Sequence, residues 1–403
     1  MQIKQPQLHP PGSFSNNSLN WALFFGSVFF MIANLFASIA IFPSYSLAIG
    51  STPFQAGLQN TAFGLAAVLL RFFLGPVMDQ KGPKPLMLLG LFSFATTPLL
   101  LLLSPSYSML LAARIYQSLG LAVCLPGIST LTAEMAPQGR IGTYLGAARI
   151  FINLGLLAGP SAALFIVGRL SYSHWFVASA LICTAALALL AGVKTPAVPV
   201  RVEKVAGSWK QIRSALSEKR IYPIIASIAL YSFTYSAVVS FSAVHIETTN
   251  PELEAALFFV ILGLAGIAAC IGAGALSDRF GRGKTAWPLL AILGIGAAVF
   301  NFLPLWPGLL VVCAIILGIG IQGSSLVFAA WLIDISKPEL RATTISIQEN
   351  TIDILFAFGA LVFGLAAQGP GLGSAFLAAG LVTVAAVLPL CRKSAQSAGK
   401  SIQ

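Results

Sequence analysis

The chain alternates between long hydrophobic runs and short polar segments from one end to the other. A helix needs about 20 apolar residues to cross the hydrocarbon core of a bilayer, and in lipid the backbone amides of a helix are satisfied within the helix itself. The runs are too long and continuous for the alternating strands of a membrane β-barrel. The pattern therefore predicts an all-α polytopic membrane protein with 12 transmembrane helices, at residues 20–43, 53–78, 86–104, 107–130, 142–167, 175–193, 221–244, 254–277, 286–303, 308–333, 343–366 and 373–390.

One long polar segment divides these runs into six and six. Residues 194–220 are rich in lysine and arginine and are predicted to form a cytoplasmic linker. The sequence then divides into an N-terminal six-helix bundle at 20–193 and a C-terminal six-helix bundle at 221–391. Residues 1–19 and 392–403 are predicted to be cytoplasmic tails.

Composition supports the membrane assignment, and the distribution of charge orients the chain. Only 9% of the residues are charged, whereas soluble chains are typically about a quarter charged. Of the 23 Lys and Arg residues, 19 fall on the side of the N-terminus and only Arg169 falls on the other side. Positively charged loops stay in the cytoplasm, so we expect a multi-pass protein of the cell (inner) membrane with both termini inside. The net charge of +11 is then a topology signal, and no nucleic-acid partner is expected.

The two halves of the chain repeat each other. Equivalent residues recur at a nearly constant offset of 199 to 201 positions: Asp79 and Asp278, Gly82 and Gly281, Gly120 and Gly320, Glu134 and Asp334, Arg140 and Arg341, Gly159 and Gly359. Parallel six-helix repeats are one of the common transporter plans, with the substrate site near the middle of the membrane between the halves. The repeat therefore predicts two bundles related by an axis along the membrane normal.

A short charged motif occurs once in each half, between the second and third runs. The segment "GALSDRFGR" fits the form G-x-x-x-D-[RK]-x-G-[RK] with Gly274, Asp278, Arg279, Gly281 and Arg282. The earlier segment "GPVMDQKGPK" keeps three of these positions, Gly75, Asp79 and Gly82. On these motifs and the repeat, the chain resembles the major facilitator superfamily across nearly its whole length. The resemblance implies two six-helix bundles related by a pseudo-two-fold axis and secondary transport by alternating access.

Two further motifs support this resemblance. The segment "RIYQSLG" in the fourth run is similar to the family pattern R-x-x-Q-G-x-G at Arg114, Gln117 and Gly120. This similarity implies that Arg114 faces the substrate cavity. The fifth run resembles the signature of the family's antiporters at Gly146, Gly155, Gly159 and Pro160, although Ala163 and Leu164 replace the two glycines that close that signature.

The resemblance also implies a role for the charged motifs as cytoplasmic latches. We expect each motif in a turn of two to six residues whose glycine permits the tight bend. In the family, the aspartate of the motif faces the start of a helix in the other half, where the helix dipole stabilises a carboxylate by about 0.3–1 kcal/mol. Asp79 would then lie near Thr343 and Asp278 near Thr143. These contacts would form only in the state that is closed on the cytoplasmic side.

Five ionisable residues lie inside the predicted helices: Arg71, Arg114, Arg149, Glu349 and Asp353. A charge near the centre of a bilayer costs at least ~2.5–3.5 kcal/mol, so such residues normally face the bundle interior and have a partner or a function. Glu349 and Asp353 are four residues apart and share one helix face, about 12 and 18 Å from the cytoplasmic rim. Two carboxylates in a medium of low dielectric suit proton uptake and release. We expect Arg71 to approach Glu349 in the state that is closed on the cytoplasmic side.

The repeat leaves the substrate class open. At an offset of 200, Arg149 matches Glu349 and Asn153 matches Asp353, which suits a zwitterion, an anion or internal charge balance. The first run has no acidic residue, so proton coupling has to rest on the two carboxylates. We expect a proton-coupled exporter of a small organic molecule, driven by the proton gradient without a cofactor. An importer of an organic anion or zwitterion and a receptor without transport activity are the alternatives.

The remaining candidates are weaker. The segments "GRGKT" at 281–285 and "GIGIQG" at 318–323 lack the strand–loop–helix context of phosphate sites, so we expect no nucleotide, and no metal-ligand or catalytic pattern indicates an enzyme. His245 is expected to be solvated near the outer end of its helix. We expect a monomer in the bilayer, whose further cavity candidates are Asn34, Gln117, Asn153, Tyr231, Tyr235, Gln322 and Trp331.

Overall fold

Twelve helices long and apolar enough to span a membrane make up the described part of the chain. The computed structural model describes residues 18–103, 105–137, 140–195, 213–214, 216–218, 220–336 and 340–399, without the side chains of 79, 141–142, 341–343, 346 and 393–399. The helices are α1 (Ser18–Ala48), α2 (Pro53–Lys81), α3 (Pro83–Leu103), α4 (Tyr107–Met135), α5 (Ile141–Arg169), α6 (Tyr172–Gly192), α8 (Ile221–Thr249), α9 (Ala255–Phe280), α10 (Arg282–Phe300), α11 (Leu309–Ile335), α12 (Arg341–Ala366) and α13 (Leu372–Gly399).

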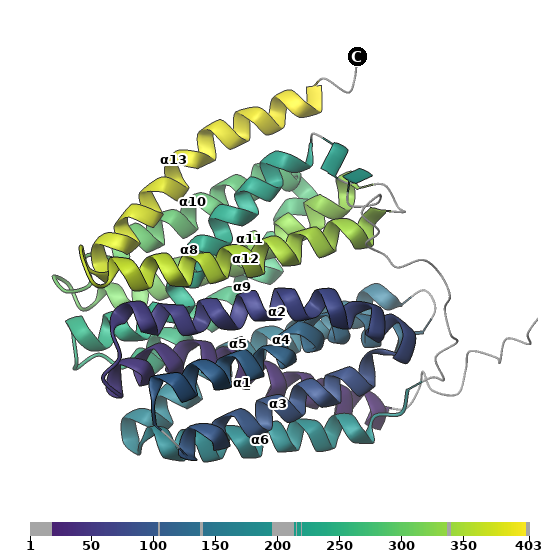
Figure 1. The fold of residues 1–403 in the computed structure, drawn as a ribbon. Coiled ribbons are helices and arrows are strands. Elements are labelled where there is room, and N and C mark those ends of the chain that lie inside the picture. Colours follow the sequence, from purple (N-terminus) through teal and green to yellow (C-terminus); the bar gives the residue numbers. More distant parts are fainter. Residues whose placement is uncertain are drawn as a thin grey trace, which may run out of the picture.

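The helices form two groups with the same internal packing. In the first group α1 packs on α5 and α6, α3 on α4 and α6, and α2 on α4. In the second group α8 packs on α12 and α13, α10 on α11 and α13, and α9 on α11. Each pair of the first group has its equivalent in the second, and the two groups lie one above the other in Figure 1. The predicted fold of two repeated six-helix bundles is confirmed.

Glycines at equivalent positions bring equivalent helices into close contact. A Cβ atom on Gly159 of α5 would lie 2.0 Å from the carbonyl oxygen of Ala33 in α1. A Cβ atom on Gly359 of α12 would lie 3.0 Å from the carbonyl oxygen of Phe233 in α8. Both helix pairs therefore approach through a backbone surface that a side chain would block, and the offset of 200 residues found in the sequence is visible in the packing.

The turns that carry the charged motifs are shorter than expected. Gly82 alone separates α2 from α3, and Gly281 alone separates α9 from α10. Their φ angles are 80° and 96°, a backbone conformation that only glycine adopts readily. The expected role of the two glycines is confirmed, but the expected loop of two to six residues is wrong. Asp79 and Asp278 lie in the last turn of a helix because the helices continue almost to the bend.

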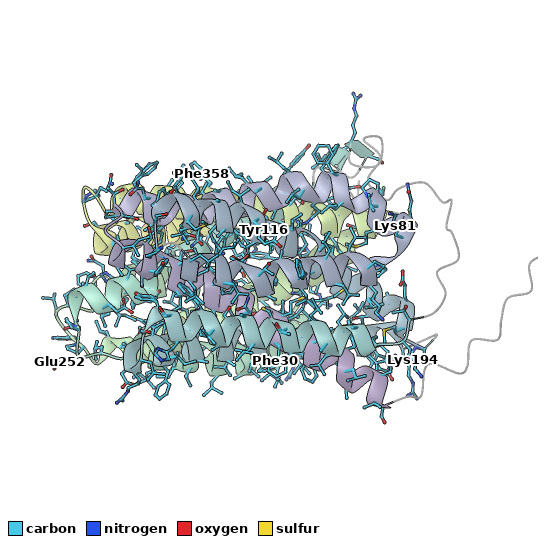
Figure 2. All side chains as sticks on the ribbon, turned by 60° about the horizontal axis from the view of Figure 1, so that its bottom comes forward. Phe30, Lys81, Tyr116, Lys194, Glu252 and Phe358 are labelled. Atoms are coloured by element: carbon cyan, nitrogen blue, oxygen red, sulfur yellow. The ribbon has the colours of Figure 1, made fainter. Side chains whose placement is uncertain are left out.

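The two ends of the molecule differ in the charged residues they carry and in how far apart the two bundles lie. Lys81 and Lys194 lie at the end of the bundles that carries the linker, called here the linker end, and Glu252 lies at the opposite, far end (Figure 2). Lys194 is held there by reciprocal hydrogen bonds between its backbone and the side chain of Asn20, at 2.7 and 2.9 Å. The two bundles spread apart toward the linker end in Figure 1.

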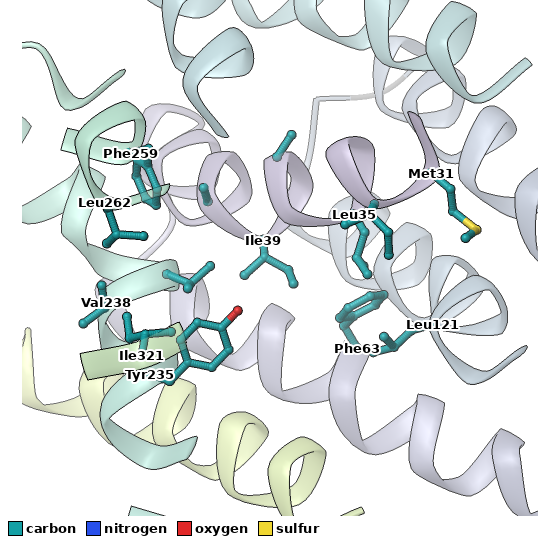
Figure 3. Close-up of a cluster of buried hydrophobic side chains, with 14 of the residues drawn as sticks. Met31, Leu35, Ile39, Phe63, Leu121, Tyr235, Val238, Phe259, Leu262 and Ile321 are labelled. Carbon is teal, nitrogen blue, oxygen red and sulfur yellow. The ribbon is translucent and has the colours of Figure 1, made fainter. Parts of the chain in front are cut away.

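The bundles meet through helices that the repeat relates. α2 packs on α12, α5 packs on α9, and α1 packs on α8. Since α9 is the equivalent of α2 and α12 the equivalent of α5, the first two contacts are copies of each other. Buried hydrophobic side chains of both bundles belong to one cluster (Figure 3), among them Met31, Leu35, Ile39, Phe63 and Leu121 of the first bundle and Tyr235, Val238, Phe259, Leu262 and Ile321 of the second.

The close packing of α5 on α1 predicts a large difference between two glycines of the same helix. A methyl group at Gly159 meets backbone, whereas a Cβ atom at Gly146 has no neighbour within 4 Å. Overpacking costs about 1–3 kcal/mol, while alanine is favoured over glycine in an open helix by up to about 1 kcal/mol. We expect Gly159→Ala to lower the melting temperature of the purified protein in micelles and Gly146→Ala to leave it unchanged or raise it. Equal melting temperatures for the two variants would show that α1 and α5 do not pack as described.

Candidate functional site

Four charged side chains bridge the two bundles at one level. Arg71 of α2 contacts Asp353 of α12, with Nη1 and Oδ2 2.6 Å apart. Arg149 of α5 contacts Glu349 of α12, with Nη2 and Oε1 3.8 Å apart. Both carboxylates come from the second bundle and both guanidinium groups from the first. These four residues, called here the seam charges, lie about 12 to 18 Å along their helices from the linker end, at 1.5 Å per residue.

The two ion pairs differ in strength and in accessibility. The side chains of Arg71 and Asp353 are 18% and 13% exposed, and Arg71 also donates a hydrogen bond of 3.2 Å to Oδ1 of Asn350. The side chains of Arg149 and Glu349 are 55% and 38% exposed. Their separation exceeds the 2.7–2.9 Å of a good charge-assisted hydrogen bond. The first pair is a closed structural contact, and the second is loose and open to a ligand or to water.

Arg71 does not contact Glu349 in this structure, and the expected pairing of the two residues, which requires the cytoplasm-closed state, stays a prediction. α2 packs on the face of α12 that carries Asn350, Asp353 and Ala357: Arg71 contacts the first two, and Thr61 donates a 2.8 Å hydrogen bond to the carbonyl oxygen of the third. Glu349 lies one turn nearer the linker end than Asp353, about 6 Å along the axis and about 40° around it, and contacts Arg149 of α5 instead. Counting residues predicted the level of the charges correctly, but the packing of α2 and α5 on either side of α12 decides the partners.

Other polar candidates gather beside the loose pair. The side chain of Tyr231 in α8 interacts electrostatically with Arg149, Glu349 and Cys270. Asn153 of α5 lies one turn from Arg149, and its Nδ2 atom is 3.5 Å from Sγ of Cys270 in α9. Three helices of the two bundles thus supply groups within reach of the same two charges.

The aromatic and amide candidates extend this region into the second bundle. The rings of Tyr231 and Tyr235 stack with a centroid distance of 5.6 Å, and Tyr235 makes an edge contact with Phe356 of α12. Gln322 of α11 packs against Gly266 of α9, one turn from the cysteine that contacts Asn153. The sequence analysis did not identify Asn350, which accepts a hydrogen bond from Arg71.

Arg114 is not at the seam, and the expectation that it faces a cavity is wrong in this structure. Its side chain is fully buried within the first bundle. The guanidinium donates hydrogen bonds to Oδ1 of Asn60 and Oε1 of Gln117, both at 2.5 Å, and lies over the ring of Phe63. Asn34 accepts a hydrogen bond from a serine of α6. The amides of Asn60 and Gln117 bind Nη2 and Nη1, while Nε of Arg114 has no hydrogen-bond partner among the described residues.

The charged motif of the second half ties three helix ends together. Arg282, which opens α10, contacts Asp278 of α9 at 2.5 Å and Asp334 of α11 at 2.8 Å. Asp278 is therefore held at its own helix end rather than at the start of α5, where Thr143 is exposed. The side chains of Asp79 and Thr343 lie outside the described part of the structure. Both latches, which require the cytoplasm-closed state, stay predictions.

The structure also shows the surroundings of three further candidates from the sequence: His245, Trp331 and the antiporter-like motif. His245 is buried, with its Nε2 atom 3.3 Å from the carbonyl oxygen of Phe300, so the expected solvation is wrong. It is covered because α10 and α13 pack on α8 at this end. Trp331 makes an edge contact with Trp287. In the antiporter-like motif, Pro160 is buried within α5, and Gly155 packs on α1 next to Gly159.

Contacts between the bundles run from the seam charges to the far end. Ser44 of α1 donates a 3.3 Å hydrogen bond to Glu247 of α8. Arg169 and Glu254 form an exposed ion pair at 3.4 Å. A Cβ atom on Gly57 of α2 would lie 2.3 Å from the carbonyl oxygen of Ala360. The hydrogen bonds and ion pairs described here between the bundles lie at the level of the seam charges or nearer the far end. The structure is closed at its far end.

Comparisons with known proteins agree with this architecture. A family model described as Major Facilitator Superfamily matches residues 23–307 and 273–400. The uncharacterized MFS-type transporter YfhI of Bacillus subtilis (strain 168) is 25% identical over 362 residues, which cover 86% of this chain and 87% of that protein. The quinolone resistance protein NorA of Staphylococcus aureus is 25% identical over 150 residues. That match spans 37% of this chain and only 38% of the relative.

Solved structures with the same fold have lower sequence identity. The nucleoside transporter NupG has a TM-score of 0.75 at 15% identity, over 94% of this chain and 99% of that one. A POT family transporter in complex with 5-aminolevulinic acid has a TM-score of 0.78 at 14% identity, over 96% of this chain and 98% of that one. At this identity, the two structures support the fold alone.

The two ion pairs should contribute differently to stability. Removing one partner of a buried pair leaves an uncompensated charge and costs about 3–5 kcal/mol, whereas an exposed pair contributes about 0–1 kcal/mol. We expect Asp353→Asn to lower the melting temperature in micelles clearly more than Glu349→Gln does. Combining Asp353→Asn with Arg71→Gln should recover part of the loss, because no unpaired guanidinium remains. A larger loss for Glu349→Gln would contradict the assigned partners.

Proposed function

The chain belongs to the major facilitator superfamily, and on that premise we propose that it is a proton-coupled exporter of small organic molecules. The observation that carries the proposal is the loose pair of Arg149 and Glu349, an accessible carboxylate held across the two bundles. A group that exchanges a proton and a substrate has to be reached by both, and the buried Asp353 is less accessible. Glu349 is therefore the proposed exchange site.

The proposed orientation places the linker end in the cytoplasm, as the distribution of lysine and arginine indicates. The far end then faces outside, and the structure corresponds to the inward-facing state. A substrate then enters from the cytoplasm and reaches the seam charges from the linker end. We place the protein in the inner membrane, as a monomer, with both termini in the cytoplasm.

The proposed cycle uses the seam charges as a two-position switch. In the inward-facing state Arg71 and Asp353 hold α2 against α12, and Glu349 exchanges its proton for a substrate. When the bundles rock, the far end opens and the substrate leaves, and a proton from outside replaces it on Glu349. A ligand shifts such an equilibrium only through a difference in affinity for the two states. The proton gradient supplies the driving force, and no cofactor is needed.

Support for the direction of transport comes from the relative whose name refers to quinolone resistance, which suggests removal of a toxic aromatic compound from the cell. One observation favours the alternative of import. Arg149 is the most exposed of the seam charges and suits an organic anion, and the structures of similar fold are titled for a nucleoside and for 5-aminolevulinic acid. Counterflow in right-side-out and inside-out vesicles distinguishes the two directions.

Proton-driven transport of a fluorescent quinolone in proteoliposomes tests the proposed function. An imposed pH gradient should drive accumulation on the acidic side, and Glu349→Gln should reduce the rate to that of liposomes without protein, because a glutamine cannot carry the proton. Glu252→Gln is the control, since that carboxylate is exposed at the far end and the change should leave the rate unchanged. Normal gradient-driven transport by both Glu349→Gln and Asp353→Asn would remove these carboxylates from the mechanism.

A further inference from the structure

We infer that the transported molecule is a zwitterion, bound with its carboxylate on Arg149 and its ammonium group on Glu349. This inference rests on the proposed function, because it takes the loose ion pair as the transport site. It names the chemical class of substrate that the sequence left open among a zwitterion, an anion and internal charge balance.

The first argument is charge balance. The seam charges form a layer of two guanidinium groups and two carboxylates. The net charge of this layer is zero when all four groups are ionised. Net charge inside a membrane protein is costly because the surroundings have a low dielectric constant. A guest with one positive and one negative group leaves the sum at zero. A guest with a single charge leaves the layer charged unless a proton accompanies it.

The second argument is geometry. Arg71 and Asp353 are 2.6 Å apart and mostly buried, so a guest gains little by separating them. Arg149 and Glu349 are 3.8 Å apart and more than a third exposed, so their mutual contact leaves donors and acceptor lone pairs free. Arginine binds a carboxylate through two parallel hydrogen bonds. A zwitterion that enters between these two residues replaces one long contact by two short ones.

The third argument is the position of the helices. α5 packs on α1 and α9, whereas α12 packs on α2 and α8. The pair of Arg149 and Glu349 therefore spans the interior between the bundles instead of stapling two packed helices. A small guest can separate the two side chains without disturbing a helix contact, and it touches both bundles at once. Contact with both bundles is required of a substrate that takes part in their relative movement.

Guests with a single charge are disfavoured for specific reasons. A monocation on Glu349 lies close to the guanidinium of Arg149, which repels it. A monoanion on Arg149 meets the carboxylate of Glu349 and binds only if that carboxylate takes up a proton. The titratable and charged groups around Glu349 are Arg149 on α5, Tyr231 on α8, and Asp353 on its own helix with its partner Arg71.

The inference gives the exchange a chemical basis. The ammonium group of the guest and a proton use the same carboxylate oxygens of Glu349, so each excludes the other. Binding of a zwitterion to the protonated site therefore releases one proton, and protonation from the other side of the membrane releases the guest. Competition for one group is the condition for exchange of one proton against one substrate.

The test uses three aromatic bodies, benzyl, indolyl and quinolone, each prepared in three charge forms. The zwitterion is compared with its methyl ester, a monocation, and its N-acetyl derivative, a monoanion. Binding to purified protein in micelles at pH 7 is measured by the concentration dependence of the melting temperature, since a ligand of the folded state raises it. We expect at least one zwitterion to bind, and both of its derivatives to bind at least about tenfold more weakly, because each has lost one charge-assisted contact.

Variants of the loose pair provide the controls. Arg149→Gln and Glu349→Gln should each weaken the zwitterion at least about tenfold. The double variant Arg149→Glu with Glu349→Arg exchanges the two charges and keeps the net charge of the four seam residues at zero. It should bind the zwitterion in the reversed orientation. Such binding would show that the loss in the single variants is not caused by misfolding. Three results would each overturn the inference. An ester or an N-acetyl derivative binds as tightly as its zwitterion or more tightly, the zwitterion still binds after Arg149→Gln, or none of the compounds binds.

Failure of this inference is distinguishable from failure of the proposed function. If a pH gradient drives transport of a monocationic ester through Glu349 while its zwitterion neither binds nor moves, proton-coupled export stands and the zwitterion assignment is wrong. If zwitterions bind through both charges but a pH gradient drives no transport, the site assignment stands and the proposed proton coupling is wrong.

Discussion

A charge inside a bilayer needs a partner, and in this protein the partner lies in the other bundle. Arg71 of α2 and Asp353 of α12 form an ion pair only while the two bundles are in contact at that level. The pair therefore does more than neutralise two residues: it makes the energy of the molecule depend on how the bundles are placed. The loose pair of Arg149 and Glu349 has the same dependence and is also accessible. Any event that removes one charge changes the balance between the two arrangements of the bundles.

The rest of the fold turns this dependence into movement of two rigid bodies. Each bundle is held together by close contacts such as that of Gly159 with the backbone of α1, and the first bundle also by the hydrogen bonds of the buried Arg114. Between the bundles, apolar side chains and a few hydrogen bonds close the far half, and the seam charges border that closed region. Apolar contacts separate and re-form without leaving unpaired charges, so the ion pairs are the contacts that a proton or a substrate controls.

The sequence predicts the features that depend on local pattern and fails for those that depend on how the helices pack. The twelve helices follow from run length, and the repeat places Gly159 and Gly359 in equivalent contacts because only glycine permits such an approach. The level of the four seam charges also follows from counting residues. The partner of Arg71 in this structure does not, because the two carboxylates of α12 lie one turn apart and the packing of α2 decides which of them it meets. Arg114 and His245 were misplaced because their burial is produced by helices distant in sequence, α2 in the first case and α10 and α13 in the second.

The central claim is that the pair of Arg71 and Asp353 holds the bundles in the arrangement that is closed at the far end. Distances between spin labels, in a background with the five native cysteines replaced, test it most directly. One label pair, at Leu170 and Glu252, reports on the far end, and another, at Thr143 and Phe280, reports on the linker end; all four residues are exposed. The account predicts that Asp353→Asn lengthens the far-end distance and shortens the linker-end distance. Unchanged distance distributions at both ends would contradict it.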